Sequence, residues 1–128
     1  MPVPDKIHDL HGTRVYEFSA EGPPPRTRRD AIELINMAWN EEATLAVISV
    51  ARLGDDFFRL KTGIAGEIVS RFAACRLRLA IVGDISRYID ESSAFRDFVY
   101  EANKGTAFWF VPDMDSLATR LARVSEAS

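Results

Sequence analysis

The sequence predicts an α/β fold: a mixed, mostly parallel sheet of about five strands flanked by helices in the order ββαβαβαβα. Three apolar runs lack the polar–apolar alternation of half-exposed strands, which is typical of strands buried on both faces of a parallel sheet. Amphipathic segments separate these runs, and such alternation predicts right-handed crossovers between parallel strands. The runs are Thr44–Val50, Arg78–Gly83 and Thr106–Val111.

The start of the chain predicts a β-hairpin. Two strand candidates, Val3–Leu10 and Thr13–Ser19, flank the dipeptide His11-Gly12, and Gly12 can adopt the positive φ of a tight turn. A hairpin pairs its strands antiparallel, so the sheet must be mixed. The run Glu21–Pro25, which holds three consecutive prolines, then predicts a surface loop.

The predicted helix starts are short polar residues that precede apolar residues at helical spacing. Thr27 with Asp30 three positions later forms a capping box, and the helix that follows is expected to end near Glu42. After a loop at Ala51–Asp56, a second helix is predicted to reach about Ala74. Its apolar stripe is Leu60, Ile64, Ile68 and Phe72.

The last two helices follow the same rules. Ser92 or Ser93 is expected to cap a helix that stops at Asn103–Gly105, with Gly105 as a left-handed cap. Pro112-Asp113 is expected to start the final helix, which carries Leu117, Leu121 and Val124 on one face. A length of 128 residues suits a single domain over residues 1–128.

Composition excludes several classes of function. A net charge of −3 argues against bulk nucleic-acid binding, which usually needs a net basic face, and leaves room only for a local basic patch. The one cysteine, Cys75, cannot form an intrachain disulfide, and this is typical of a reducing compartment. No apolar stretch reaches the roughly 20 residues that span a bilayer. We therefore expect a cytoplasmic protein without nucleic-acid or membrane partners, and no motif calls for a cofactor or a metal.

Several motifs together carry a family resemblance. Asp56–Phe58, Leu60–Ile68, Ala80–Asp84 and Phe98–Gly105 resemble, in this order, the bacterial domain-of-unknown-function family 4180. The resemblance is close over the second half of the chain and extends to the first half only in layout. It implies no activity, substrate or catalytic residue.

The element order is also similar to that of the STAS domain (sulfate transporter and anti-sigma-factor antagonist). This resemblance implies a small cytosolic binding domain that is not an enzyme. The STAS signature Asp-Ser-Ser-Gly-Leu matches Leu60-Lys61-Thr62-Gly63-Ile64, which places Thr62 at the phosphorylated position. Leu60 and Lys61 replace the Asp and the first Ser, and this departure argues against a kinase-driven switch.

Ligands of open parallel sheets bind beyond the carboxyl ends of the strands. Three loops are expected there: Arg52–Lys61, Gly83–Asp90 and Pro112–Asp115. A helix start at Thr62 would offer free N–H groups to an anion, with Lys61 adding charge; the alternative is an ordinary helix start. The candidate binding residues are Asp56, Lys61, Thr62, Gly63, Glu67, Gly83, Asp84, Asn103 and Lys104.

Other polar groups have a functional and a structural interpretation each. Asp55, Asp56 and Asp84 could cluster around a divalent cation or act in acid–base chemistry, but loop carboxylates more often serve as caps. His8 and His11 lack a third ligand of recognisable spacing, so they are expected to be structural or solvated.

Three arginines near the first helix, and two residues at the end of the third, can also be interpreted as either functional or structural. Arg26, Arg28 and Arg29 could attract an acidic partner or form an ordinary solvated surface. Asn103 and Lys104 could bind a ligand or cap helix carbonyls.

The leading functional prediction is a non-catalytic regulatory module that binds a protein partner or a small ligand. The alternative is a small enzyme that uses Asp84 or Glu67 as an acid–base group. A third interpretation is a homodimer that pairs the exposed edge of the first hairpin.

Overall fold

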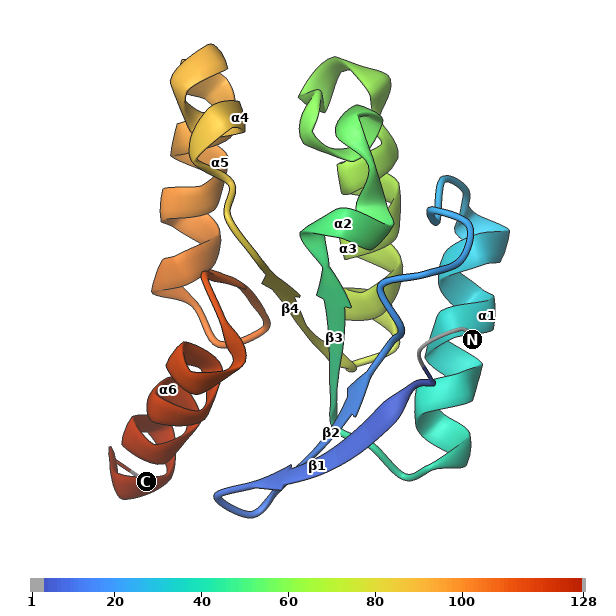
Figure 1. The fold of residues 1–128 in the computed structure, drawn as a ribbon, viewed down its shortest axis with the longest axis vertical. Helices are drawn as coiled ribbons and strands as arrows, with labels where there is room; N and C mark the ends of the chain where they lie inside the picture. Colours follow the sequence, from blue (N-terminus) through green and yellow to red (C-terminus); the bar gives the residue numbers. More distant parts are fainter. Residues whose placement is uncertain (1–3, 128) are drawn as a thin grey trace.

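A computed structural model describes residues 4–127 as one five-stranded sheet with helices on both faces (Figure 1). The strands lie side by side in chain order. The first pair is antiparallel and the other three pairs are parallel, so the predicted mixed, mostly parallel sheet is confirmed. The strands are β1 (Lys6–Leu10), β2 (Thr13–Glu17), β3 (Leu45–Ser49), β4 (Arg78–Val82) and β5 (Phe108–Val111).

Four longer helices occupy the predicted places, and two short ones were not predicted. The four are α1 (Arg28–Asn40), α3 (Ile64–Ala74), α5 (Ser93–Lys104) and α6 (Met114–Ala127). The short helices α2 (Val50–Leu53) and α4 (Ser86–Glu91) lie in segments expected to be loops. With four and six residues, they are too short to give a helical apolar period in the sequence.

The two faces of the sheet hold separate apolar clusters. Ile35 of α1, Ile68 of α3 and Phe95 of α5 belong to the larger cluster. Leu117 and Leu121 of α6 belong to the smaller one. Three helices therefore cover one face and α6 covers the other, as expected when each crossover between neighbouring strands turns in the same direction.

Strand β3 explains why the apolar runs lack alternation. Ala46 and Ile48 lie in the larger cluster, whereas Leu45 and Val47 lie in the smaller one. All four side chains are at most 1% exposed. Both faces of the strand need apolar residues because helices cover both.

Several local predictions are confirmed. The turn at His11-Gly12 has φ values of 52° and 83°, the left-handed geometry of a two-residue hairpin turn. Thr27 accepts a hydrogen bond from the Asp30 N–H at 3.1 Å, and Asp30 accepts one from the Thr27 N–H at 3.2 Å, which completes the capping box. Ser92 caps α5 by accepting from the Phe95 N–H.

Two boundary predictions were wrong. Helix α3 begins at Ile64, because the preceding residues form two three-ten turns, Asp55–Phe58 and Leu60–Thr62. Gly105 has a φ of −89°, so it ends α5 in an extended conformation and not in a left-handed cap. The predicted start of the first strand at Val3 lies outside the described residues.

Candidate functional site

The candidate site lies at the carboxyl ends of the parallel strands. We call residues 55–62, the two three-ten turns between α2 and α3, the 55–62 segment. This segment and α4 lie at the same end of the molecule, the upper end in Figure 1. Both follow strand ends, β3 and β4 respectively, which is where open parallel sheets place their ligands.

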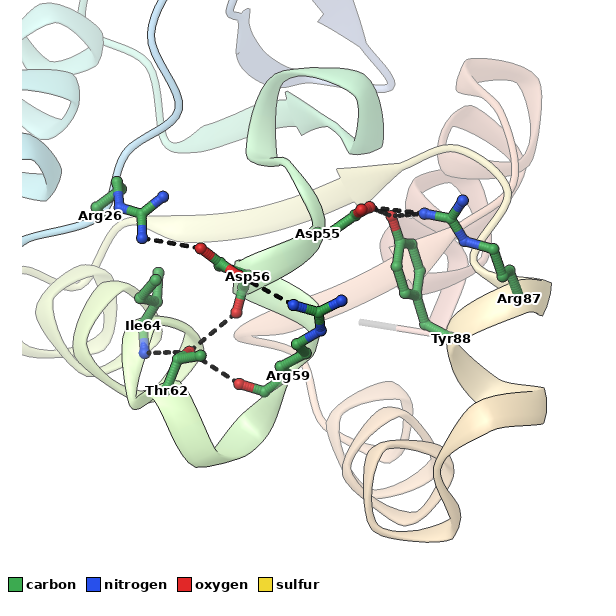
Figure 2. A network of polar contacts seen from close by, with 8 residues as sticks. All are labelled: Arg26, Asp55, Asp56, Arg59, Thr62, Ile64, Arg87 and Tyr88. Carbon is green, nitrogen blue, oxygen red and sulfur yellow. Dashed lines mark hydrogen bonds and ion pairs between the residues drawn. The ribbon is translucent and has the colours of Figure 1, made fainter.

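Two adjacent carboxylates hold the 55–62 segment from opposite sides (Figure 2). Asp56 pairs with Arg26 at 2.9 Å, Nη2 to Oδ2, and with Arg59 at 3.4 Å, Nη1 to Oδ1. Asp55 accepts hydrogen bonds at 2.6 Å from both the Arg87 guanidinium and the Tyr88 hydroxyl. The hydrogen bond from Tyr88, followed by the charge of Arg87, lowers the pKa of Asp55.

The carboxylates therefore serve as tethers with separate partners. Asp55 faces α4, whereas Asp56 faces the loop before α1. Asp84 accepts from the N–H and the hydroxyl of Ser86 at 2.9 and 2.6 Å, which lowers its pKa and ends β4 in a turn. Among residues 4–127, no group of three or more His, Cys, Asp or Glu side chains is placed to hold a metal ion.

Thr62 does not start a helix, which corrects the geometry expected for an anion site. Its hydroxyl lies 2.9 Å from the Asp56 carbonyl and 2.8 Å from the Arg59 carbonyl, and it accepts from the Ile64 N–H at 3.3 Å. Gly63 is the N-cap of α3, with a left-handed φ of 78°. The local backbone thus accounts for both residues.

The remaining predicted residues are dispersed. Glu67 is exposed on α3. Asn103 accepts a hydrogen bond from the Phe110 N–H at 2.8 Å, which satisfies a donor of the edge strand β5. Lys104 pairs with Glu101 at 3.3 Å and lies 4.3 Å from the centre of the Tyr100 ring. Asn103 and Lys104 therefore have structural contacts at the end of α5.

Helix α4 separates two hollows. The first, which we call hollow A, has a volume of about 430 Å³ and lies between the 55–62 segment, α4 and the start of α5. The second, hollow B, has about 300 Å³ and lies where β4 and β5 end. Hollow A is lined by Phe58, Arg59, Leu60, Lys61, Tyr88, Glu91, Ser92 and Ala94.

Four of the nine predicted site residues line one of the two hollows. Lys61 lines hollow A, and Gly83, Asp84 and Asn103 line hollow B. The other five line neither: Asp56, Thr62, Gly63, Glu67 and Lys104. A wider depression of about 780 Å³ also lies along α6, but its lining residues come from α6 and from Asp113 directly before it, so no second element closes it.

Hollow A has an aromatic wall that the fold holds in place. The rings of Phe58 and Tyr88 stack with 4.1 Å between their centres and 10° between their planes. Phe95 meets Phe58 edge-on at 5.6 Å. Burial, and then the hydrogen bond to Asp55, raises the pKa of Tyr88. The Tyr88 ring is thus fixed both by stacking and by its hydroxyl.

Among the residues that line hollow A, sequence reasoning predicted only Lys61 as a site residue. Its charged residues Arg59 and Glu91 and the ring of Tyr88 were missed. Arg59 and Tyr88 lie in the segments Arg52–Lys61 and Gly83–Asp90, which were expected to be loops at the carboxyl ends of the strands, but neither side chain was singled out. Glu91 lies one position beyond the second segment, at the end of α4. A signal was present at Tyr88 and Ile89, because two large side chains are unusual in a solvated loop. Their partners are distant in sequence, so the signal did not indicate which surface they cover.

The fold and this edge define a small α/β protein whose candidate site lies beyond the ends of parallel strands. The chain belongs to the family described as domain of unknown function (DUF4180), whose family model matches residues 10–121. Comparisons with curated proteins and with solved structures give no match for this chain. In the described part of the chain, no helix has the length and apolar character needed to cross a membrane.

Proposed function

We propose that this protein is a cytosolic, non-catalytic regulatory module that binds a small ligand in hollow A. The observation that carries the proposal is the hollow itself, with its fixed aromatic wall and its charged rim. Its volume of about 430 Å³ lies within the range of roughly 300–1,000 Å³ that is common for ligand sites. Its lining combines apolar groups with a few charged ones, as such sites do.

The fold already holds the aromatic wall in place. This favours binding because a ligand has to order few further groups. Asp55 fixes Tyr88 through its hydroxyl at 2.6 Å, and Phe58 stacks on the ring. Asp56 holds the same segment from the other side through Arg26. A site that is already ordered loses less conformational entropy when a ligand binds.

The enzyme alternative has weaker support. The predicted enzyme would use Glu67 or Asp84 as an acid–base group, and a paired acid and base would both have to reach one substrate. Asp84 lines hollow B and is held by Ser86, whereas Glu67 is exposed on α3 and lines neither hollow. Their positions supply no shared acid–base pair, so we favour binding over catalysis.

The proposal is tested by screening small fragments by NMR on the ¹⁵N-labelled protein. We expect binding fragments to shift the amide signals of residues 58–61 and 88–94 together. The variant Ala94→Trp should abolish these shifts, because Ala94 is an exposed residue whose enlargement fills the hollow.

Ala73→Trp is the matched control, since Ala73 is also exposed but lies on α3, outside the lining of the hollow. It should leave the fragment-induced shifts intact. If no fragment shifts these two segments, or if Ala94→Trp binds as the wild type does, hollow A is not the ligand site.

A further inference from the structure

We propose that hollow A selects small organic carboxylates with an apolar body over neutral and cationic analogues of the same shape. This inference rests on the proposed function and specifies its ligand class. It is carried by the charges on the rim of hollow A and by the apolar groups behind them.

The rim of hollow A has an excess of positive charge. Arg59 and Lys61 line it against a single acid, Glu91. Within the described chain, Lys61 has no ion-pair or hydrogen-bond partner through its side chain, and it is exposed. A carboxylate placed there would give Lys61 the counter-charge that the fold does not supply.

Arg59 is also available to a ligand. Its contact with Asp56 is 3.4 Å long, whereas Arg26 holds the other oxygen of the same carboxylate at 2.9 Å. Asp56 therefore keeps its closer partner when Arg59 turns toward a ligand. A guanidinium can bind both oxygens of a carboxylate, which an ammonium cannot do with the same geometry.

The wall behind the rim is apolar. Leu60, Ala94 and the stacked Phe58–Tyr88 pair line the hollow beside the two cations. Phe58 is only 2% exposed, so its role is to support Tyr88 more than to meet the ligand. An apolar ligand body loses water-exposed surface against this wall while its carboxylate stays at the rim.

Glu91 limits the negative charge that a ligand can carry in hollow A. It faces the same hollow as the two cations, so the lining carries a net charge of about +1 when the three groups are ionised. A cationic ligand would meet two like charges, and a dianion would be repelled by Glu91. A single carboxylate is the charge that matches this lining.

The test compares four probes in NMR titrations: benzoate, benzyl alcohol, benzylamine and acetate. We expect benzoate to bind about fivefold more tightly than benzyl alcohol, which corresponds to a partly exposed ion pair. Benzylamine, a cation at neutral pH, should bind more weakly than both, and acetate more weakly than benzoate because it lacks an apolar body.

Charge-removing variants and added salt distinguish the contribution of ligand charge to binding from that of ligand shape. Lys61→Gln and Arg59→Gln should remove most of the preference for benzoate over benzyl alcohol, and Glu91→Gln should increase it. Arg123→Gln, at an exposed position on α6, should change nothing. Added salt should weaken benzoate binding and leave benzyl alcohol binding unchanged.

The outcomes distinguish this inference from the proposed function. If benzyl alcohol or benzylamine binds at residues 58–61 and 88–94 at least as tightly as benzoate does, hollow A binds ligands but the carboxylate preference is wrong. If the preference survives in Lys61→Gln and Arg59→Gln, the two cations do not cause it. If none of the four probes and no fragment binds there, the proposed function itself fails.

Discussion

Gly83 is the residue whose smallness the fold most clearly requires. It has a φ of 142°, and a Cβ at this position would lie 2.8 Å from Cγ2 of Val50 and 2.9 Å from its Cβ. The end of β4 therefore lies directly against the start of α2. We expect Gly83→Ala to lower the free energy of unfolding by about 2–4 kcal/mol, through backbone strain and overpacking together. Urea denaturation monitored by circular dichroism measures the loss.

Gly66→Ala is the matched control for this prediction. Gly66 lies in α3, and an added Cβ there would meet no atom within 4 Å. The substitution should raise stability by up to about 1 kcal/mol, because alanine favours a helix over glycine. A Gly83→Ala protein within about 0.5 kcal/mol of the wild type would show that the contact with Val50 relaxes at little cost.

For individual residues, the number of positions between two interacting partners decides whether their contact can be predicted from the sequence. Thr27 and Asp30 are three positions apart, so their capping box is visible as a motif. The pair Arg26–Asp56 joins positions 30 apart, and Arg87–Asp55 joins positions 32 apart. No local pattern encodes such pairs, which is why Asp56 was predicted as a site residue without Arg26, and why Tyr88, which bonds to Asp55 from 33 positions away, was missed.

One arginine ties helix α6 to the end of α5, in addition to the apolar packing of Leu117 and Leu121. Arg120 donates to the carbonyls of Asn103 and Gly105, at the end of α5. Its guanidinium carbon also lies 4.2 Å from the centre of the buried Trp109 ring, and that of Arg78 lies 4.9 Å from it. Burial, together with the nearby charge of Arg78, lowers the pKa of Arg120. The carbonyls and the ring offset the cost of placing two cations so close together.

We expect Arg120→Ala to lower the free energy of unfolding by about 1.5–3 kcal/mol, because it removes a charged donor from partly buried carbonyls. The fluorescence of Trp109 should change as well, measured in a Trp39→Phe background because the exposed Trp39 would otherwise contribute to the signal. Arg123→Ala, one turn later and exposed, should change neither quantity by a measurable amount. Equal effects of both variants would contradict a specific tie between α6 and α5.

The elements themselves divide into those that periodicity reveals and those that it does not. The amphipathic stripes of α1, α3 and α5 were predicted because each spans three turns or more of helix. Helix α4 was not, although it separates the two hollows and supplies Tyr88 and Glu91. The candidate site is therefore less predictable than the fold, since short elements and tertiary contacts build it.

For the whole molecule, the order of the strands leaves β1 at one edge of the sheet. Apolar runs and crossover rules predicted the parallel part, and the hairpin turn predicted the antiparallel edge. The similarity to the STAS fold stays a prediction. So does the homodimer, because edge pairing depends on a second chain that no pattern within one chain specifies.

The edge of β1 makes the dimer testable. An unpaired strand edge can pair with a second copy, and Ile7 on this strand is 42% exposed. The strand is only five residues long and carries the exposed charges of Lys6 and Asp9, which limit such pairing. We therefore expect a weak dimer, whose mean mass by light scattering rises with concentration toward twice that of one chain.

Ile7→Lys should keep the protein monomeric over the whole concentration range, because it adds like charge to both strands of the paired edge. Met37→Lys is the control of equal exposure, 42%, on α1, and should dimerise as the wild type does. Pairing through β1 would be ruled out if the mean mass of the wild type stays equal to that of one chain. It would also be ruled out if the Ile7→Lys variant still dimerises. If the dimer tolerates Ile7→Lys, the interface lies on another face. Light scattering of variants with substitutions at exposed positions of α1 and α5 would then locate it.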